Sequence, residues 1–160
     1  MFKLLYSLVV IGFIPLVINN ALAQDFDDVV VSVHGVSGNV SYIAGRGGNI
    51  GLFIGEDGVF LIDDQYAPLT EKIVAAIQAI SDEPIRFLVN THMHPDHTGG
   101  NENFGRLGTL IFGHDNVRKQ MELSGYLQEP PLITFSKDMS FHINGERVNV
   151  FKVPDAHTNG

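Results

Sequence analysis

Residues 85–101 decide the fold, and they read IRFLVNTHMHPDHTGGN. The stretch opens with a nearly continuous apolar run, Ile85 to Val89, of the kind that forms a strand buried on both faces. A loop with three histidines within six residues follows directly and ends at two glycines. Histidines so close together are a poor choice for a turn or a helix cap unless something binds them.

The donor atoms of this loop suit a metal ion. Side chains two positions apart in an extended stretch face the same way, so His92 and His94 can reach one metal. Asp96 and His97 follow at the turn and can face a second metal beside the first. Imidazole and carboxylate without thiolate suit Zn²⁺, although iron and manganese accept the same ligands. The sequence therefore predicts a metal site just past a buried strand.

His157 is the natural third imidazole for the first metal. It follows a strand-like run, 147–153, and precedes Thr158. A catalytic zinc typically has three protein ligands and one open position for water, and His92, His94 and His157 supply that count. The alternative is an exposed polar residue without a ligand role.

The flanking segments predict a sheet with helices packed outside it. Four strand-like runs precede the histidine loop, at 29–33, 40–44, 50–54 and 59–63, with a helix at 67–81. A strand at 109–112, a helix at 115–123 and a hairpin turning at Asn144-Gly145 come after it. The glycines at 45–48 predict a hairpin turn rather than a phosphate-binding loop, because the Lys-Ser/Thr of such a loop does not follow.

The amino-acid composition limits which ligands and metal-binding residues the chain can use. The 160 residues suffice for one domain, and 18 acidic against 10 basic residues give a formal net charge of −8, which argues against a nucleic-acid partner. The chain has no cysteine, which excludes disulfides and thiolate zinc sites. Any metal must therefore be bound by His, Asp and Glu, and we expect the substrate to be a small molecule.

Residues 1–23 have the pattern of a signal peptide. Lys3 precedes an apolar run from Leu4 to Ile18, and Ala21-Leu22-Ala23 fits a cleavage site. An uncleaved membrane anchor is the alternative, but the run is shorter than the roughly 20 residues that a spanning helix needs. We therefore expect residues 24–160 to form the domain of an exported protein, periplasmic or secreted, without stable membrane anchoring after cleavage.

The motif 91–101 resembles the signature loop of the metallo-β-lactamase superfamily. Val59–Asp63 resembles the strand that ends in the family's structural aspartate, and 156–160 resembles its later His-Thr loop. The resemblance implies an α+β fold, an αββα sandwich with a one- or two-zinc site at the edge shared by its sheets. A histidine directly after Asp96 resembles the His-x-His-x-Asp-His members: the third β-lactamase subclass, lactone hydrolases, glyoxalase II-like thioesterases and RNA 3′-processing nucleases. The acidic charge and the predicted export count against the nucleases.

The resemblance also implies roles for the residues of the motif. The first metal would be bound by His92, His94 and His157. The second would have only Asp96 and His97, so we expect the second site to be incomplete in this chain. Asp63 would brace the metal loop through hydrogen bonds, a role that usually matters for metal affinity. The alternative for Asp63 is an ordinary turn carboxylate at a strand end.

The implied activity is that of a zinc-dependent hydrolase. A metal-bound hydroxide would attack the carbonyl carbon of a β-lactam, a lactone or a thioester, with Asp96 as the catalytic residue that orients the nucleophile and handles its proton. Family members continue beyond the His-Thr loop, so we expect the N-terminal half of a sandwich, which self-associates or requires a missing C-terminal half. Two alternatives stay open: a metal-binding chain without catalytic activity, and an iron-bound redox relative on the same fold.

Overall fold

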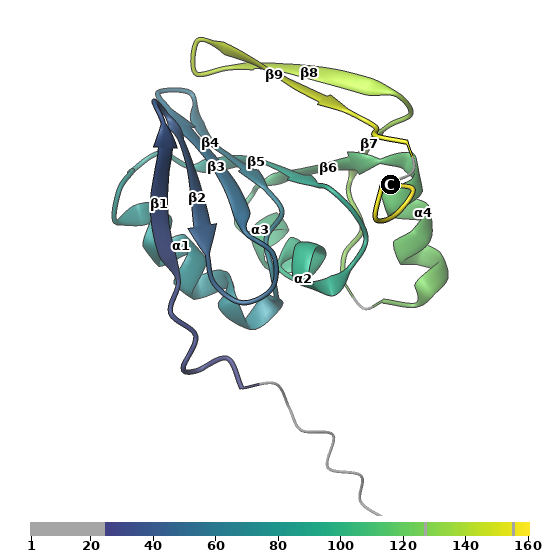
Figure 1. Ribbon diagram of the computed structural model, residues 1–160, viewed down its shortest axis with the longest axis horizontal. Helices are drawn as coiled ribbons and strands as arrows, with labels where there is room; N and C mark the ends of the chain where they lie inside the picture. Colours follow the sequence, from purple (N-terminus) through teal and green to yellow (C-terminus); the bar gives the residue numbers. More distant parts are fainter. Residues whose placement is uncertain (1–24, 127, 155) are drawn as a thin grey trace, which may run out of the picture.

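The structure, a computed structural model, describes residues 25–126, 128–154 and 156–160 (Figure 1). The predicted signal peptide, residues 1–23, lies outside the described residues and stays a prediction. Within the described ranges, no helix is both long enough and apolar enough to span a membrane.

A mixed seven-stranded sheet is the centre of the fold, and its strands lie side by side in sequence order. The first four are antiparallel to one another: β1 (Ser32–Ser37), β2 (Val40–Ala44), β3 (Ile50–Gly55) and β4 (Gly58–Ile62). The next three continue the sheet parallel to β4: β5 (Ile85–Asn90), β6 (Leu110–His114) and β7 (Ile133–Phe135). The parallel strands place the histidine loop at the carboxyl end of β5.

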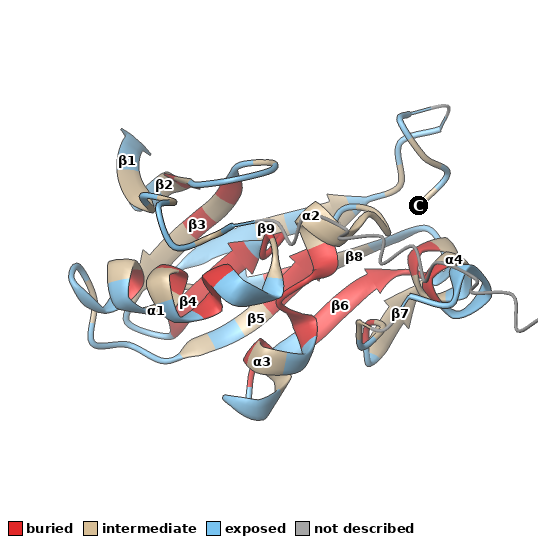
Figure 2. Ribbon diagram, turned by 90° about the horizontal axis from the view of Figure 1, so that it is seen from below, coloured by how far each residue is buried: buried red, intermediate tan, exposed pale blue. Residues whose placement is uncertain are grey.

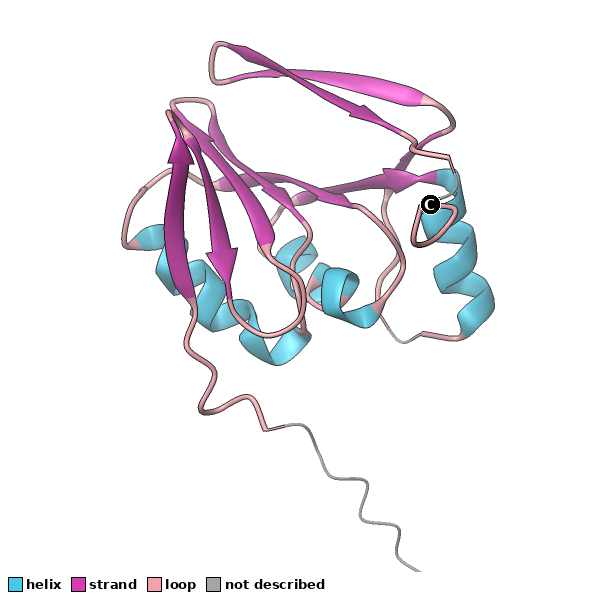
Figure 3. Cartoon of the chain, viewed as in Figure 1, coloured by secondary structure: helices cyan, strands magenta, loops and turns pink. Residues whose placement is uncertain are grey.

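Helices cover one face of this sheet, and a separate two-stranded hairpin covers the other (Figures 1 and 3). The helical segments are η1 (Ala67–Leu69), α1 (Thr70–Gln78), α2 (Pro95–Thr98), α3 (Asn101–Arg106) and α4 (Asp115–Ser124). The hairpin consists of β8 (Asp138–Ile143) and β9 (Glu146–Phe151). Its turn residues Asn144 and Gly145 both have positive φ, 55° and 73°, as a tight two-residue hairpin turn requires.

Alternation along the strands builds two apolar cores. Val59 and Leu61 of β4 belong to the core beneath the helices, together with Ile73 and Ile77 of α1. Phe60, between them, belongs to the core beneath the hairpin. Successive side chains of a strand point to opposite faces, so one central strand can serve both cores. Buried residues are accordingly concentrated in the middle strands (Figure 2), and the predicted α+β class is confirmed.

The boundaries of two predicted elements need correction, and two segments were missed. The strand predicted at 29–33 begins later, at Ser32, and continues to Ser37 as β1. Before it, the carbonyl oxygens of Phe26, Asp27 and Val29 accept hydrogen bonds from Lys72 Nζ at 2.9, 2.6 and 3.0 Å. A side chain of α1 thus binds backbone groups that a strand partner would otherwise satisfy. The helix predicted to reach residue 81 ends at Gln78. The segments α3 and β7 were not predicted.

Candidate metal centre

The histidine loop connects β5 to the short helix α2. His94 directly precedes α2, with Pro95 at its first position, where the missing N–H of proline costs nothing. The His94 carbonyl accepts the backbone N–H groups of His97 and Thr98 at 2.9 and 3.2 Å. The sequence predicted a loop throughout this stretch. The helical turn instead places Asp96 and His97 one turn beyond His94.

The structure brings together His92, His94 and His157. One ring nitrogen from each of the three lies within 4.8 Å of the others, an arrangement that could hold a metal ion. His157 Nε2 lies 3.1 Å from His94 Nδ1. Nitrogens bound to one tetrahedral zinc lie about 3.3 Å apart, so this contact already has the spacing of a shared metal. The three imidazoles therefore suit zinc in their chemistry, and one pair of them already has a suitable separation.

Burial keeps one of these imidazoles suited to metal binding. Burial lowers the pKa of His92, and the nearby His97 adds to the effect. A neutral imidazole has a free lone pair, whereas a protonated one has none to offer. His92 is therefore ready to bind a cation at neutral pH.

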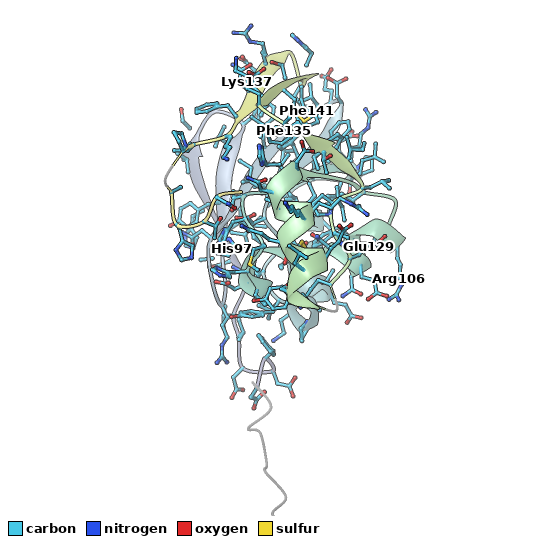
Figure 4. The ribbon with its side chains drawn as sticks, turned by 90° about the vertical axis from the view of Figure 1, so that its right-hand side faces the viewer. His97, Arg106, Glu129, Phe135, Lys137 and Phe141 are labelled. Carbon is cyan, nitrogen blue, oxygen red and sulfur yellow. The ribbon has the colours of Figure 1, made fainter. Side chains whose placement is uncertain are left out.

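Asp96 and His97 lie beside the three histidines and form a second potential donor group. The rings of His92 and His97 are 4.0 Å apart between centroids. His97 Nε2 lies 3.4 Å from Asp96 Oδ2. In Figure 4 the labelled His97 lies well apart from Phe135 and Phe141, so the metal loop and the hairpin core occupy different parts of the molecule.

Asp63 contacts the histidine loop at three points from the end of β4. Its carboxylate accepts hydrogen bonds from the backbone N–H and the hydroxyl of Thr91, each at 2.7 Å. It also accepts the Nδ1–H of His97, again at 2.7 Å. This bond leaves the Nε2 of His97 free to act as a donor to a metal.

The same carboxylate determines the charge state of His97. Burial lowers the pKa of His97, but the hydrogen bond and the negative charge of Asp63, with a contribution from Asp96, outweigh it and leave this pKa raised. His97 therefore retains a proton to higher pH than an ordinary histidine does. Because Nδ1–H remains bonded to Asp63, that extra proton is on Nε2, and Nε2 becomes available to a metal only when the proton is lost.

Several residues that sequence reasoning missed also hold this loop. Asn90 and Asn101 exchange side-chain hydrogen bonds at 3.0 and 2.9 Å, and Asn90 also donates to the carbonyl of His97 at 3.1 Å. Asp64 is buried and accepts the backbone N–H of Gly100 at 3.0 Å. Burial raises the pKa of the Asp64 carboxyl well above its usual value. The only local signal of this support is the density of Asn, Asp and Gly on either side of the histidines.

The fold and this donor set define an α+β protein with a candidate histidine metal centre at the end of a central parallel strand. Residues 43–119 match the family model of the metallo-beta-lactamase superfamily. Over 98 residues the chain is 30% identical to the linear primary-alkylsulfatase of Pseudomonas sp. (strain ATCC 19151), a match that covers 54% of this chain and 18% of that protein.

Solved structures agree with the family match at the level of the fold. A metallo-beta-lactamase from Pontibacter korlensis superposes with a TM-score of 0.66 at 23% identity, covering 76% of this chain and 60% of that one. The metallo-beta-lactamase FIM-1 from Pseudomonas aeruginosa, in its mono-zinc form, superposes with a TM-score of 0.63 at 21% identity. That match covers 76% of this chain and 57% of FIM-1. The family model thus matches about half of the chain, and the chain spans about 60% of the length of these structural neighbours, whose fold it shares.

Proposed function

We propose that this chain contains the first zinc site of a metal-dependent hydrolase that attacks a carbonyl centre. The observation that carries the proposal is the cluster of His92, His94 and His157, whose ring nitrogens lie within 4.8 Å of one another. Bound there, zinc would lower the pKa of a coordinated water towards about 7 and polarise a substrate carbonyl. The three imidazoles would leave a fourth position open for that water.

Asp96 is the residue we assign to proton handling. Its side chain is 31% exposed and lies on the turn beside His97. It can accept a hydrogen bond from a water molecule at the metal centre and so orient that water's lone pair towards the substrate. His97, held by Asp63 with its Nε2 directed towards Asp96, supplies the second donor of a possible second zinc site.

The substrates that we propose first are β-lactams, lactones and thioesters. The partial match to a linear primary-alkylsulfatase favours a second candidate, hydrolysis of a primary alkyl sulfate ester. The same polarised electrophile and oriented water serve both reactions, with sulfur in place of carbon as the centre attacked. A metal-binding chain without catalytic activity and an iron-bound redox relative are the competing proposals.

The test is zinc-dependent turnover by the purified chain of a chromogenic β-lactam, a lactone, a thioester and a primary alkyl sulfate. We expect turnover of at least one class, lost after chelation and in His92→Ala. His142→Ala is the matched control, since His142 is exposed on β8, and it should retain the activity. Bound zinc without turnover of any class would support the inactive metal-binding chain instead. Retention of iron in place of zinc would support the redox relative.

A further inference from the structure

The glycine-rich turn between β2 and β3, residues 45–49, lies directly against the metal loop. A Cβ atom added at Gly48 would come 2.5 Å from Cε1 of His97, and one added at Gly47 would come 2.8 Å from Cβ of Asp96. Such distances are shorter than carbon atoms tolerate, so only a glycine backbone can approach so closely. The turn therefore contacts both residues that would form the second metal site.

The side chain of Gln65 is hydrogen-bonded to this turn. Its side chain is fully buried, and its Nε2 donates a hydrogen bond to the carbonyl of Gly48 at 2.6 Å. A Cβ atom at Gly45 would come 2.5 Å from Gln65 Oε1, so the amide fills the space beneath the turn. The buried amide thus spans from the end of β4 to the backbone that lies on His97.

The backbone of Gln65 is strained. Its φ is +57°, in the left-handed region that costs a residue with a Cβ atom about 1 kcal/mol. Glycine would avoid this strain, but glycine has no amide to reach Gly48. Strain of this kind persists where the surrounding structure imposes it, and it is concentrated at functional sites. The retained amide therefore indicates a role for the contact with Gly48.

We propose that Gln65 is a positioning residue that clamps the 45–49 turn onto the imidazole of His97. The ring is then held at Nδ1 by Asp63 and at Cε1 by the backbone of Gly48, before any metal binds. Preorganisation of this kind lowers the cost of ordering the donor when the cation arrives. Only the metal-binding part of the test rests on the proposed function, because the ring contacts belong to the metal-free chain.

The first test replaces Gln65 by methionine. Gln65→Met keeps the length of the side chain and the strained backbone, and it removes the amide together with a buried Oε1 that has no hydrogen-bond partner in the described structure. In the metal-free chain, nitrogen-15 NMR should show the Nδ1 proton of His97 exchanging with water about fivefold to tenfold faster, as expected for loss of one hydrogen bond. In a zinc titration, the second ion should bind about tenfold more weakly while the first binds as in the parent.

A pair of alanine substitutions tests the contact between the 45–49 turn and the His97 ring. Gly48→Ala places a methyl group against His97, whereas Gly35→Ala is its matched control, because nothing lies within 4 Å of a Cβ atom there. We expect Gly48→Ala to accelerate exchange of the His97 ring proton and to weaken the second zinc, and Gly35→Ala to leave both unchanged.

Three results would contradict the proposed positioning role of Gln65. They are an unprotected His97 ring proton in the parent, parent-like exchange in Gln65→Met, and equal effects of the two alanine substitutions. If Gln65 has only a general structural role, Gln65→Met should weaken the binding of both zinc ions to the same extent, which would also contradict the proposal. A parent chain that binds no zinc would refute the proposed function, while the comparison of ring-proton exchange would still decide the clamp.

Discussion

Replacing Asp63 by asparagine perturbs the metal loop with almost no change in shape. The carboxylate accepts from the Thr91 backbone through Oδ1, and from the Thr91 hydroxyl and His97 Nδ1 through Oδ2. In Asp63→Asn one oxygen can keep the backbone bond, and an NH₂ group then occupies the Oδ2 position. The Thr91 hydroxyl can turn to accept from that group. The bond from His97 Nδ1–H cannot survive, because two donors would then face each other.

The size of the effect follows from this single lost contact. A hydrogen bond to a charged group contributes about 1.5–3 kcal/mol to the free energy of unfolding, which is the loss expected for Asp63→Asn. His97 can recover a bond only by accepting at Nδ1, which moves its proton to Nε2, the atom 3.4 Å from Asp96. A protonated Nε2 cannot bind a metal. The affinity for the second zinc should therefore fall about 10- to 100-fold.

The effect also depends on pH, through His97. Its pKa in the folded chain is raised above the ordinary value of 6.5, so the folded state binds the proton more tightly than the unfolded state. This stabilisation is fully present below pH 6.5 and is lost as the pH rises through the raised pKa. The parent should therefore exceed Asp63→Asn in unfolding free energy by more at pH 6 than at pH 9.

Urea unfolding of the metal-free chain at the two pH values measures these differences, and nitrogen-15 NMR reports the tautomer of His97. The matched control is Asp57→Asn at the other end of β4, where the carboxylate accepts the backbone N–H of Asn144 at 2.6 Å. Because the amide oxygen introduced by Asp57→Asn can still accept that bond, the variant should lose less stability than Asp63→Asn and should leave the His97 tautomer unchanged. An unchanged tautomer in Asp63→Asn, or an equal stability loss at pH 6 and pH 9, would show that Asp63 does not hold His97 by this bond.

Three further predictions concern the surroundings of the site. Asp64→Asn should flatten the pH dependence of stability: the raised pKa of the buried carboxyl makes the parent less stable as the pH rises above about 4, and parallel urea curves for parent and variant would contradict this. Asn101→Ala should cost about 2–3 kcal/mol in urea unfolding, because it removes both hydrogen bonds that the buried amide of Asn90 exchanges with Asn101. A loss below about 0.5 kcal/mol would show that this pair is dispensable. Lys72→Met should speed hydrogen exchange of the amides in 27–31 while β4 stays protected, and unchanged exchange would mean that the three carbonyl contacts do not hold this segment.

Much of the fold follows from local patterns in the sequence. The strand predicted at 40–44 is β2 itself, and the buried run from Ile85 extends only one residue further than predicted. The turn at Asn144-Gly145 is confirmed, because its two residues favour the positive φ that the turn needs. These elements were predictable because periodicity and turn chemistry depend on neighbouring residues.

The missed elements lack such local signals. β7 has only three residues and pairs with β6 through its backbone, and α3 is a short polar segment in which Phe104 is the main apolar anchor. Helix α1 ends before Ile80, and the core contains Ile73 and Ile77 but leaves Ile80 52% exposed.

In the candidate site, too, some features are predictable from local sequence patterns and others are not. Spacing alone groups His92 with His94, and the addition of His157 depended on its place after a strand. The contact of Gln65 with Gly48 joins residues 17 positions apart through a strained backbone, and no pattern in the sequence predicts it. The metal-binding histidines could therefore be predicted from the sequence, whereas the residues that hold them in place could not.

The presence of a histidine metal centre can be measured as zinc content per chain after dialysis. The three chains compared are the parent, His92→Ala/His94→Ala and His34→Ala/His142→Ala. We expect close to one tightly bound zinc in the parent and in the control pair, and none in the loop variant. Equal zinc in all three chains, or no retained zinc in the parent, would contradict a metal centre built from His92, His94 and His157.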